Sequence, residues 1–224
     1  MNYQWLIHGG DRTRWVWHYW RIYFEAYCTI PAGLDTVFLT EQSPIPKEWA
    51  PIRAATTGKM AFTSQLLKYF DRCRAKYILY SMDDFFLLGQ PDFEKINALV
   101  DIMKYKGIKL IKLFGNKHTT AAMRESKPDS DWLHIYEFWR PYIISCQPSI
   151  WEKEFLMSSL LANKTGAQFE IHGSLRCKQN AMCYTDPNIF PYKEGIRGGK
   201  IRAGSEHLFE KSTLPKKAQN DKAD

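Results

Sequence analysis

Hydrophobic and polar positions along the first half of the chain predict strands that alternate with helices. Compact apolar runs of strand length predict strands over 3–10, 35–41, 76–82 and 108–115. Segments with apolar or aromatic residues three or four positions apart predict helices over 11–28, 63–75 and 91–107. This order favours an α/β fold in which helices flank a mixed, Rossmann-like sheet.

The second half of the chain is less regular. His134–Ser145 predicts one or two strands, and Ser149–Asn163 predicts a helix. In the first half, Pro44, Pro46 and Pro51 predict a loop after the second strand. A length of 224 residues, with 45% hydrophobic and 25% charged residues, suits a single globular domain.

The chain carries an excess of positive charge, +7 from 31 basic and 24 acidic residues. Such an excess permits anionic partners: nucleic acid, an anionic membrane surface or phosphorylated small molecules. Nucleic acid is an unlikely partner, because neither a basic-aromatic RNA motif nor zinc-finger spacing occurs. Part of the charge lies in residues 206–224, which predict a polar, basic, flexible tail because they have little to bury.

The cysteine pattern and hydropathy bear on the compartment. Five scattered cysteines without a CxxC pair suggest free thiols in a reducing environment. The sequence shows neither an apolar stretch of transmembrane length nor the pattern of a secretion signal. We therefore expect a cytoplasmic protein.

The segment YILYSMDDFF (77–86) closes a predicted buried strand with two adjacent carboxylates, Asp83 and Asp84. Ligands of open α/β sheets gather at the carboxyl ends of the strands. Two ionised carboxylates repel each other unless a cation joins them, and Mg²⁺ or Mn²⁺ often binds one or two carboxylates together with substrate phosphates. The alternative is a solvated turn or a helix cap. The apolar residues 85–88 that follow place the pair at the edge of the core.

Three motifs, in this order, carry a resemblance to a known family. MDDFFL (82–87), QPSIW (147–151) and FEIHGS (169–174) resemble segments of small bacterial and viral glycosyltransferases with the GT-A fold. The resemblance spans about Tyr3 to Lys200. It implies one GT-A-like domain over 1–205, made of a nucleotide-binding half and an acceptor-binding half that meet near residue 115.

The resemblance also implies a divalent cation, usually Mn²⁺, between the aspartate motif and the diphosphate of a sugar nucleotide. Here the motif is D-D in place of the commoner D-x-D, which leaves open whether Asp83 or Asp84 contacts the metal directly. GT-A enzymes can use a late histidine as a further metal ligand, and His207 has that position in the chain.

A carboxylate must remove the proton of the acceptor hydroxyl in an inverting glycosyltransferase. By resemblance, Glu170 in FEIHGS is the choice for this base, with Asp186 and Glu137 as runners-up. The alternative for Glu170 is a surface position or a pairing with Arg176.

Further residues are predicted to contact the substrates. The alternative for each is a structural one: a turn, a solvated charge or a place in the core. Glycines after the first strand would let backbone N–H groups approach the nucleotide. The residues predicted to bind the nucleotide-sugar are His8, Gly9, Gly10, Arg12, Thr40, Glu41, Lys59 and Met82. Those predicted to shape the acceptor or donor-sugar pocket are Gln147, Ser149, Trp151 and His172. GIRGGKI (195–201) predicts either a flexible segment over a diphosphate or a basic hairpin.

These observations favour a metal-dependent, inverting, hexosyltransferase-like enzyme. It would transfer a sugar from a nucleotide-diphosphate sugar to a glycan or lipid-linked acceptor in polysaccharide synthesis, with peripheral membrane contact as a further use of its charge. One alternative is a nucleotidyltransferase or another metal-dependent nucleotide enzyme. Another is a non-catalytic protein that binds glycans or nucleic acid through its aromatic surface, since aromatic residues make up 15% of the chain.

Overall fold

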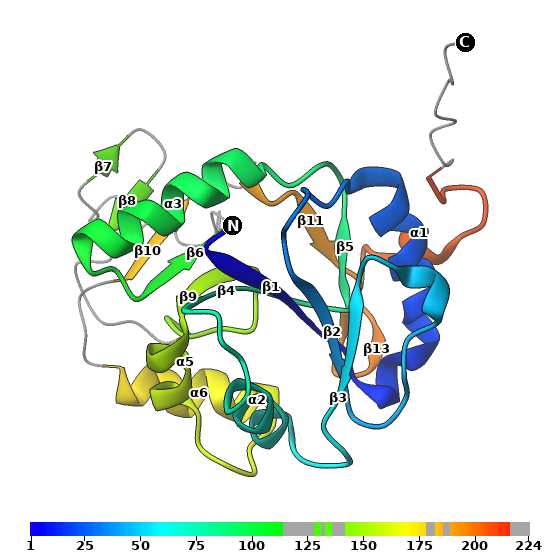
Figure 1. Ribbon diagram of the computed structural model, residues 1–224. Coiled ribbons are helices and arrows are strands. Elements are labelled where there is room, and N and C mark those ends of the chain that lie inside the picture. The colour runs from blue at the N-terminus through cyan, green and yellow to red at the C-terminus, as the bar shows by residue number, and fades with distance from the viewer. Residues whose placement is uncertain (114–127, 131–132, 136–141, 178–181, 186–188, 216–224) are drawn as a thin grey trace.

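A mixed sheet runs through the molecule and carries both halves of the chain (Figure 1). The computed structural model describes residues 1–113, 128–130, 133–135, 142–177, 182–185 and 189–215. Within these ranges the sheet has nine strands, in the order β3-β2-β1-β4-β9-β6-β10-β8-β7. The predicted α/β class is confirmed.

Four neighbouring strands of the sheet are parallel and come from the first half of the chain. They are β3 (Arg53–Thr56), β2 (Thr36–Thr40), β1 (Tyr3–His8) and β4 (Tyr77–Met82). His8, the last residue of β1, lies opposite Leu39 and Met82 in the neighbouring strands. The segments that follow these strands, including Asp83 and Asp84, therefore begin at one edge of the sheet.

The other strands extend the sheet beyond β4. They are β9 (Ser149–Glu152), β6 (Leu110–Lys112), β10 (Met182–Thr185), β8 (Leu133–Ile135) and β7 (Pro128–Ser130). Strand β9 is antiparallel to both of its neighbours, β4 and β6, whereas β10 is parallel to β6. The sheet is therefore mixed, as the sequence predicts.

Helices cover the sheet on both faces (Figure 1). Helices α1 (Trp17–Tyr27) and α3 (Phe93–Lys106) pack on one face, and α2 (Phe62–Phe70), α5 (Lys153–Ser159) and α6 (Gly166–Arg176) on the other. Successive side chains of a strand point to opposite faces. Trp5 therefore joins the core under α1 and α3, whereas Leu6 joins the core under α2, α5 and α6.

Helix α3 shows how local sequence signals set the ends of a helix. The Asp92 side chain accepts a hydrogen bond from the Lys95 N–H at 3.0 Å, which caps the first turn. Gly107 ends the helix in the left-handed conformation, with φ of 69°. The prediction for 91–107 is confirmed. The other two predicted helices are shorter, because η1 (Asp11–Val16) is a 3-10 segment before α1 and α2 ends at Phe70.

Two strands occur where the sequence predicts other structure. The prolines predict a loop, but residues 53–56 form β3, an edge strand whose side chains are largely exposed and lack an apolar run. The helix predicted over Ser149–Asn163 begins only at Lys153, since residues 149–152 form β9. Ile150 and Trp151 are buried on opposite faces of the sheet. A short run buried on both faces has no period that separates a strand from a helix.

A small second sheet lies next to the end of β4. After Asp83 and Asp84 the chain forms β5 (Phe85–Leu87), which pairs in antiparallel fashion with β11 (Tyr192–Glu194). The following β12 (Ile196–Arg197) and β13 (Lys200–Ile201) form a hairpin. Its turn residues Gly198 and Gly199 have φ of 60° and 79°, a conformation that favours glycine. GIRGGKI therefore forms a hairpin in the structure.

The first residues of the predicted tail have ordered structure. Residues 206–209 form the 3-10 segment η5 (Glu206–Phe209), and Leu208 is buried in the core. The Phe209 ring contacts the rings of Phe86 and Trp15. Leu208 and Phe209 therefore anchor this polar segment, because both side chains pack against the core. Residues 216–224 lie outside the described residues. Across the part of the chain that the structure describes, no helix is long and apolar enough to cross a membrane.

Candidate active site

The two aspartates at the end of β4 have different environments. Asp83 is 2% exposed, and its Oδ2 accepts hydrogen bonds from Trp17 Nε1 at 2.7 Å, Thr13 Oγ1 at 2.9 Å and the Gly10 N–H at 3.2 Å. Burial raises the pKa of Asp83 to about 6, although these three bonds oppose the rise. The Asp83 side chain is therefore an anchor between β4, the turn after β1 and the start of α1.

Asp84 lacks such partners. Its Oδ1 is buried and has no hydrogen-bond partner among the described residues. Burial, and then the negative charges of Asp83 and Glu194, raise the pKa of Asp84 well above its usual range. A buried carboxylate oxygen without a partner is unfavourable, and a bound cation is one of the few groups that can satisfy it.

Glu194 brings a third carboxylate to this edge. The pairing of β5 with β11 places Glu194 opposite Phe85, the residue after Asp84. In addition, the Gly195 N–H donates to the Asp84 carbonyl at 2.8 Å. The Glu194 carboxylate pairs with the guanidinium groups of Arg197 and Arg202. These cations reach the site from the β12–β13 hairpin and the residue after it. Glu194 could not be predicted from the sequence, because no local motif distinguishes it and it lies 110 positions after Asp84.

Glu170 lies on α6, at the second face of the sheet. Its Oε1 accepts the Cys146 N–H at 2.8 Å. Burial raises the pKa of Glu170, while the Cys146 N–H and the Lys112 ammonium oppose the rise. Lys112, on β6, donates to the Tyr142 carbonyl at 2.7 Å, and burial lowers its pKa to about 8. Glu170 is thus a half-buried carboxylate with one anchored oxygen and a raised proton affinity. The pairing with Arg176 is not among its contacts in the structure.

His8, Gly9 and Gly10, predicted to bind the nucleotide, make contacts within the protein. Both ring nitrogens of His8 face side chains, Gln65 at 3.1 Å and Tyr80 at 3.3 Å, and burial lowers the pKa of His8 to about 4. The Gly9 N–H donates to Leu39, and the Gly10 N–H donates to Asp83, so neither presents a free donor to a nucleotide. A Cβ on Gly9 would lie 2.5 Å from Phe38, which explains the glycine by close packing.

The remaining residues predicted to bind the nucleotide-sugar are scattered along the same edge. Thr40 is buried and donates to the Ser43 carbonyl at 2.7 Å. Glu41 accepts a weak bond from Gln65 at 3.4 Å, Met82 is half-buried and Lys59 is exposed. The guanidinium of Arg12 is exposed and lies beside Gly199, in the turn of the β12–β13 hairpin.

The predicted sugar-pocket residues divide between core and surface. Ser149 and Trp151 are each 1% exposed, and Trp151 Nε1 donates to Ser149 Oγ at 2.7 Å, so both belong to the core through β9. Gln147 accepts the Ser149 hydroxyl through its carbonyl at 2.8 Å. Gln147 and His172 are half-buried. Two other candidates, Glu137 and Asp186, lie outside the described residues.

The predicted metal ligands do not form a complete protein cage. His207 is exposed on η5, and within the described ranges no three His, Cys, Asp or Glu side chains gather as a metal-holding group. Asp83, Asp84 and His207 therefore do not converge. Mg²⁺ and Mn²⁺ sites that use one or two carboxylates plus substrate phosphates need no such cage. The unpartnered Asp84 oxygen, with Glu194 nearby, fits a site of that kind.

Solved structures with the same fold include one in complex with UDP-GlcNAc. Staphylococcus aureus TarS 1-349 superposes with a TM-score of 0.53 at 8% identity, over 84% of this chain and 59% of that one. TarS 1-349 in complex with UDP-GlcNAc gives 0.52 at 9% identity, over 83% and 58% of the two chains. Glucosyl-3-phosphoglycerate synthase from Mycobacterium tuberculosis, in complex with phosphoglyceric acid, gives 0.50 at 11%, over 87% and 72%.

These comparisons establish the fold of the chain. It has the GT-A-type α/β fold that its resemblance to glycosyltransferases implies. The chain spans just under three fifths of TarS 1-349. No protein-family profile and no curated protein sequence matches it.

Proposed function

We propose that the protein transfers a sugar from a nucleotide-diphosphate sugar and that Asp84 is the carboxylate that holds its divalent cation. The observation that carries this proposal is the buried Oδ1 of Asp84, at the carboxyl end of a central strand, which has no hydrogen-bond partner in the described part of the chain. Ligands of open α/β sheets bind at that edge. The GT-A-type fold supports the choice of substrate, as does the presence of UDP-GlcNAc in one structure with the same fold.

The residues around Asp84 have different proposed roles. A bound Mn²⁺ or Mg²⁺ would neutralise the charge that grows on the leaving diphosphate. Asp83 holds the β4–β5 turn against α1 and so positions its neighbour. Arg197 and Arg202, already at the site through Glu194, are the cations best placed to approach an anionic donor.

Glu170 is the proposed base. It would accept the proton of the acceptor hydroxyl as that hydroxyl attacks the sugar, which is the role a raised carboxylate pKa suits. Attack assisted in this way gives inversion at the sugar carbon. The acceptor we propose is a glycan or a lipid-linked glycan in polysaccharide synthesis.

A donor screen tests the proposal directly. With Mn²⁺ present, the protein should hydrolyse at least one nucleotide-diphosphate sugar and release the nucleoside diphosphate, and a chelator should stop the release. Nucleoside triphosphates should yield no pyrophosphate. Turnover of triphosphates, or failure to hydrolyse or bind any sugar nucleotide, would contradict glycosyl transfer.

The acid side of the pH profile reports on Glu170. Protonated Glu170 cannot accept a proton, so kcat should fall as the pH is lowered through the pKa of Glu170. This pKa lies above the ordinary glutamate value because of burial. Glu170→Gln should lower kcat by about 10²–10⁴-fold and remove this part of the profile. Initial rates between roughly pH 4 and pH 8 measure both effects.

The exposed Glu154 on α5 provides the matched control, since it is a glutamate of a neighbouring helix with 73% of its side chain exposed. Glu154→Gln should keep the full profile. A Glu170→Gln enzyme with normal kcat and an unchanged acid limb would assign the base to another residue.

A further inference from the structure

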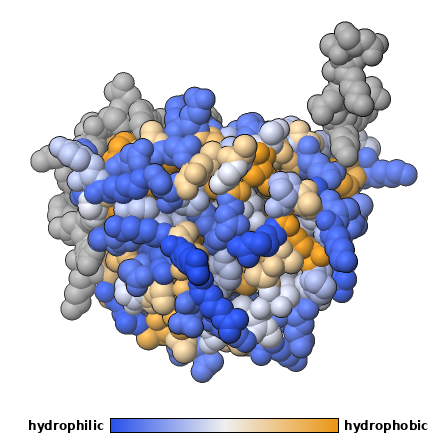
Figure 2. Space-filling view, in the orientation of Figure 1, coloured by the Kyte–Doolittle hydropathy of each residue, from blue (hydrophilic) through white to orange (hydrophobic). Residues whose placement is uncertain are grey.

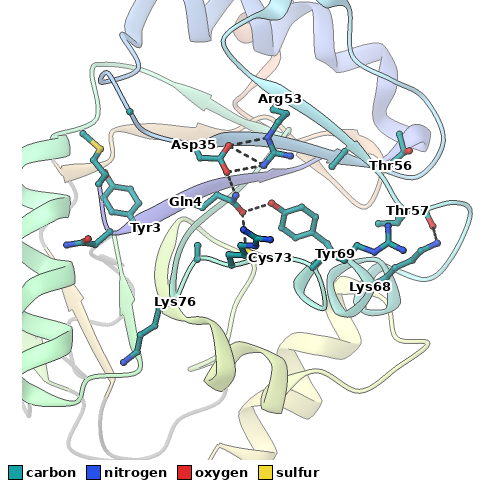
Figure 3. Close-up of a pocket in the computed structure, with 17 residues that line it drawn as sticks. Tyr3, Gln4, Asp35, Arg53, Thr56, Thr57, Lys68, Tyr69, Cys73 and Lys76 are labelled. Carbon is teal, nitrogen blue, oxygen red and sulfur yellow. Dashed lines mark hydrogen bonds and ion pairs between the residues drawn. The ribbon is translucent and has the colours of Figure 1, made fainter.

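A hollow of about 730 Å³ lies away from the residues described above. It starts where β1, β2 and β4 begin and continues along the edge strand β3 beside α2 (Figure 3). None of the predicted site residues lines it. In Figure 2, which views the face that carries the N-terminus, hydrophilic side chains gather across the middle.

The floor of the hollow is a connected set of hydrogen bonds. Gln4 is 5% exposed and sits at its centre, donating to Asp35 and accepting from the Tyr69 hydroxyl. Cys73 Sγ also donates to Gln4 at 3.3 Å. Arg53 donates three bonds to Asp35, at 3.0, 3.2 and 3.3 Å (Figure 3). These polar side chains are thus held in place by one another, so this part of the surface is preorganised.

The charge around the hollow is strongly one-sided. Its basic side chains are Arg53, Lys68, Arg72, Arg74 and Lys76. Asp35 is the single acidic residue among the described lining residues, so the lining side chains carry a formal charge of +4. The charge of Asp35 is already met by Arg53.

Several of these cations are available to a ligand. Arg72 and Arg74 are exposed and pair with no described side chain. Lys68 donates to the Thr57 carbonyl at 2.6 Å, and Lys76 lies over the Tyr77 ring at 5.6 Å. Neither contact neutralises the lysine charge. Like charges gathered around a concavity repel one another, and an anion bound among them removes that repulsion.

We propose that this hollow, defined by the residues around Gln4, Arg72 and Arg74, binds a phosphate-bearing ligand. Guanidinium groups match the geometry of phosphate oxygens with two parallel N–H donors. The hydroxyl groups of Thr56 and Tyr69 add polar groups to the lining. The phosphate belongs either to a soluble molecule or to a lipid headgroup, and the same donors serve both.

The hollow and the proposed catalytic edge are separate sites. β1 has six residues, so Gln4 near its start and the Asp83–Asp84 turn beyond its end lie roughly 15–20 Å apart. The catalytic edge gathers carboxylates, whereas the hollow gathers cations. Binding at the hollow should therefore need no divalent metal, which distinguishes it from the binding of a donor at Asp84.

Pyrophosphate in a chelator is the probe that tests this site. We expect calorimetry to show binding that weakens as salt is added, because the cations are exposed and screened. The double variant Arg72→Glu and Arg74→Glu brings the formal charge of the hollow to zero and should weaken binding by about tenfold or more. The same charge reversal on α3, Lys104→Glu with Lys106→Glu, should leave binding unchanged.

Two further experiments distinguish a soluble phosphate from a lipid headgroup, and the hollow from the proposed catalytic edge. Vesicles of phosphatidylglycerol, compared with phosphatidylcholine alone, show whether a headgroup is bound through Arg72 and Arg74. Asp84→Asn should still bind pyrophosphate in chelator even if it no longer binds a sugar nucleotide. Absence of binding to both pyrophosphate and phosphatidylglycerol would overturn the proposal. An equal loss of pyrophosphate affinity in the Arg72→Glu, Arg74→Glu variant and in the α3 variant would overturn it as well, since binding would then follow net charge alone.

Discussion

Asp84→Asn is expected to lower metal-dependent sugar transfer by about 10²–10³-fold while leaving the protein as stable as before, or more stable. The loss of transfer follows because an amide holds a divalent cation far less well than a carboxylate. Stability is kept because the carboxylate has a buried oxygen that no described residue bonds, and because it lies close to the charges of Asp83 and Glu194. A neutral side chain removes that repulsion. Initial rates with Mn²⁺, and thermal unfolding without metal, measure the two effects.

Asp101→Asn is the matched control for this variant. Asp101 lies on α3 with 70% of its side chain exposed, and it pairs with Lys104. Both transfer and stability should stay close to the wild-type values, because exposed ion pairs contribute at most about 1 kcal/mol. Full metal-dependent transfer by Asp84→Asn would show that the cation is held elsewhere.

Asp83→Ala should act in the opposite sense, through stability. Removing its carboxylate leaves Trp17 Nε1 and the Gly10 N–H without their acceptor, whereas Thr13 Oγ1 still has the Gly10 carbonyl at 3.0 Å. We expect the free energy of unfolding to fall by about 2–4 kcal/mol, because a buried unsatisfied donor loses its hydrogen bonds to water as well. Urea denaturation in chelator measures this change apart from any metal binding.

A second substitution tests the reason for that loss. Trp17→Phe removes the indole donor, which makes the shortest of the three bonds, at 2.7 Å. Adding it to Asp83→Ala should cost less than Trp17→Phe costs in the wild-type protein, so the two changes should be non-additive. An Asp83→Ala protein that is fully stable, with transfer alone abolished, would make Asp83 a metal ligand and not an anchor.

Together these variants would resolve what the adjacent aspartates do. Neighbouring residues at the end of a strand leave it in different directions, so two identical side chains meet different surroundings. In this protein one carboxylate accepts hydrogen bonds from the turn after β1 and from α1, and the other feels the negative charges of Asp83 and Glu194. The D-D pair thus supplies one structural and one proposed metal-binding carboxylate.

The local part of the fold could be predicted from the sequence. Asp92 and Gly107 mark the ends of α3 because capping and left-handed glycines act within a few residues. The strands that end at His8 and Met82 are apolar runs buried on both faces of the sheet. Because such runs alternate with helices along the chain, the sequence predicts a sheet flanked by helices. The edge strand at Arg53 and the strand at Ser149 could not be predicted, because the first has largely exposed side chains without an apolar run and the second is a short run buried on both faces.

The sequence by itself determined the chemical types at the catalytic edge: an α/β sheet that delivers Asp83 and Asp84 to the end of a buried strand, with Glu170 later in the chain. Only the tertiary structure decided which carboxylate is free. Asp83 is satisfied by Trp17 and Thr13 from a distant segment, and Glu194 reaches Asp84 through the pairing of β5 with β11. The cationic hollow was likewise settled by tertiary structure, since Gln4, Arg53 and Arg72 come from three separate elements. The physical reason is the same in both cases: hydrogen bonding and electrostatics depend on proximity in space, and proximity is set by packing.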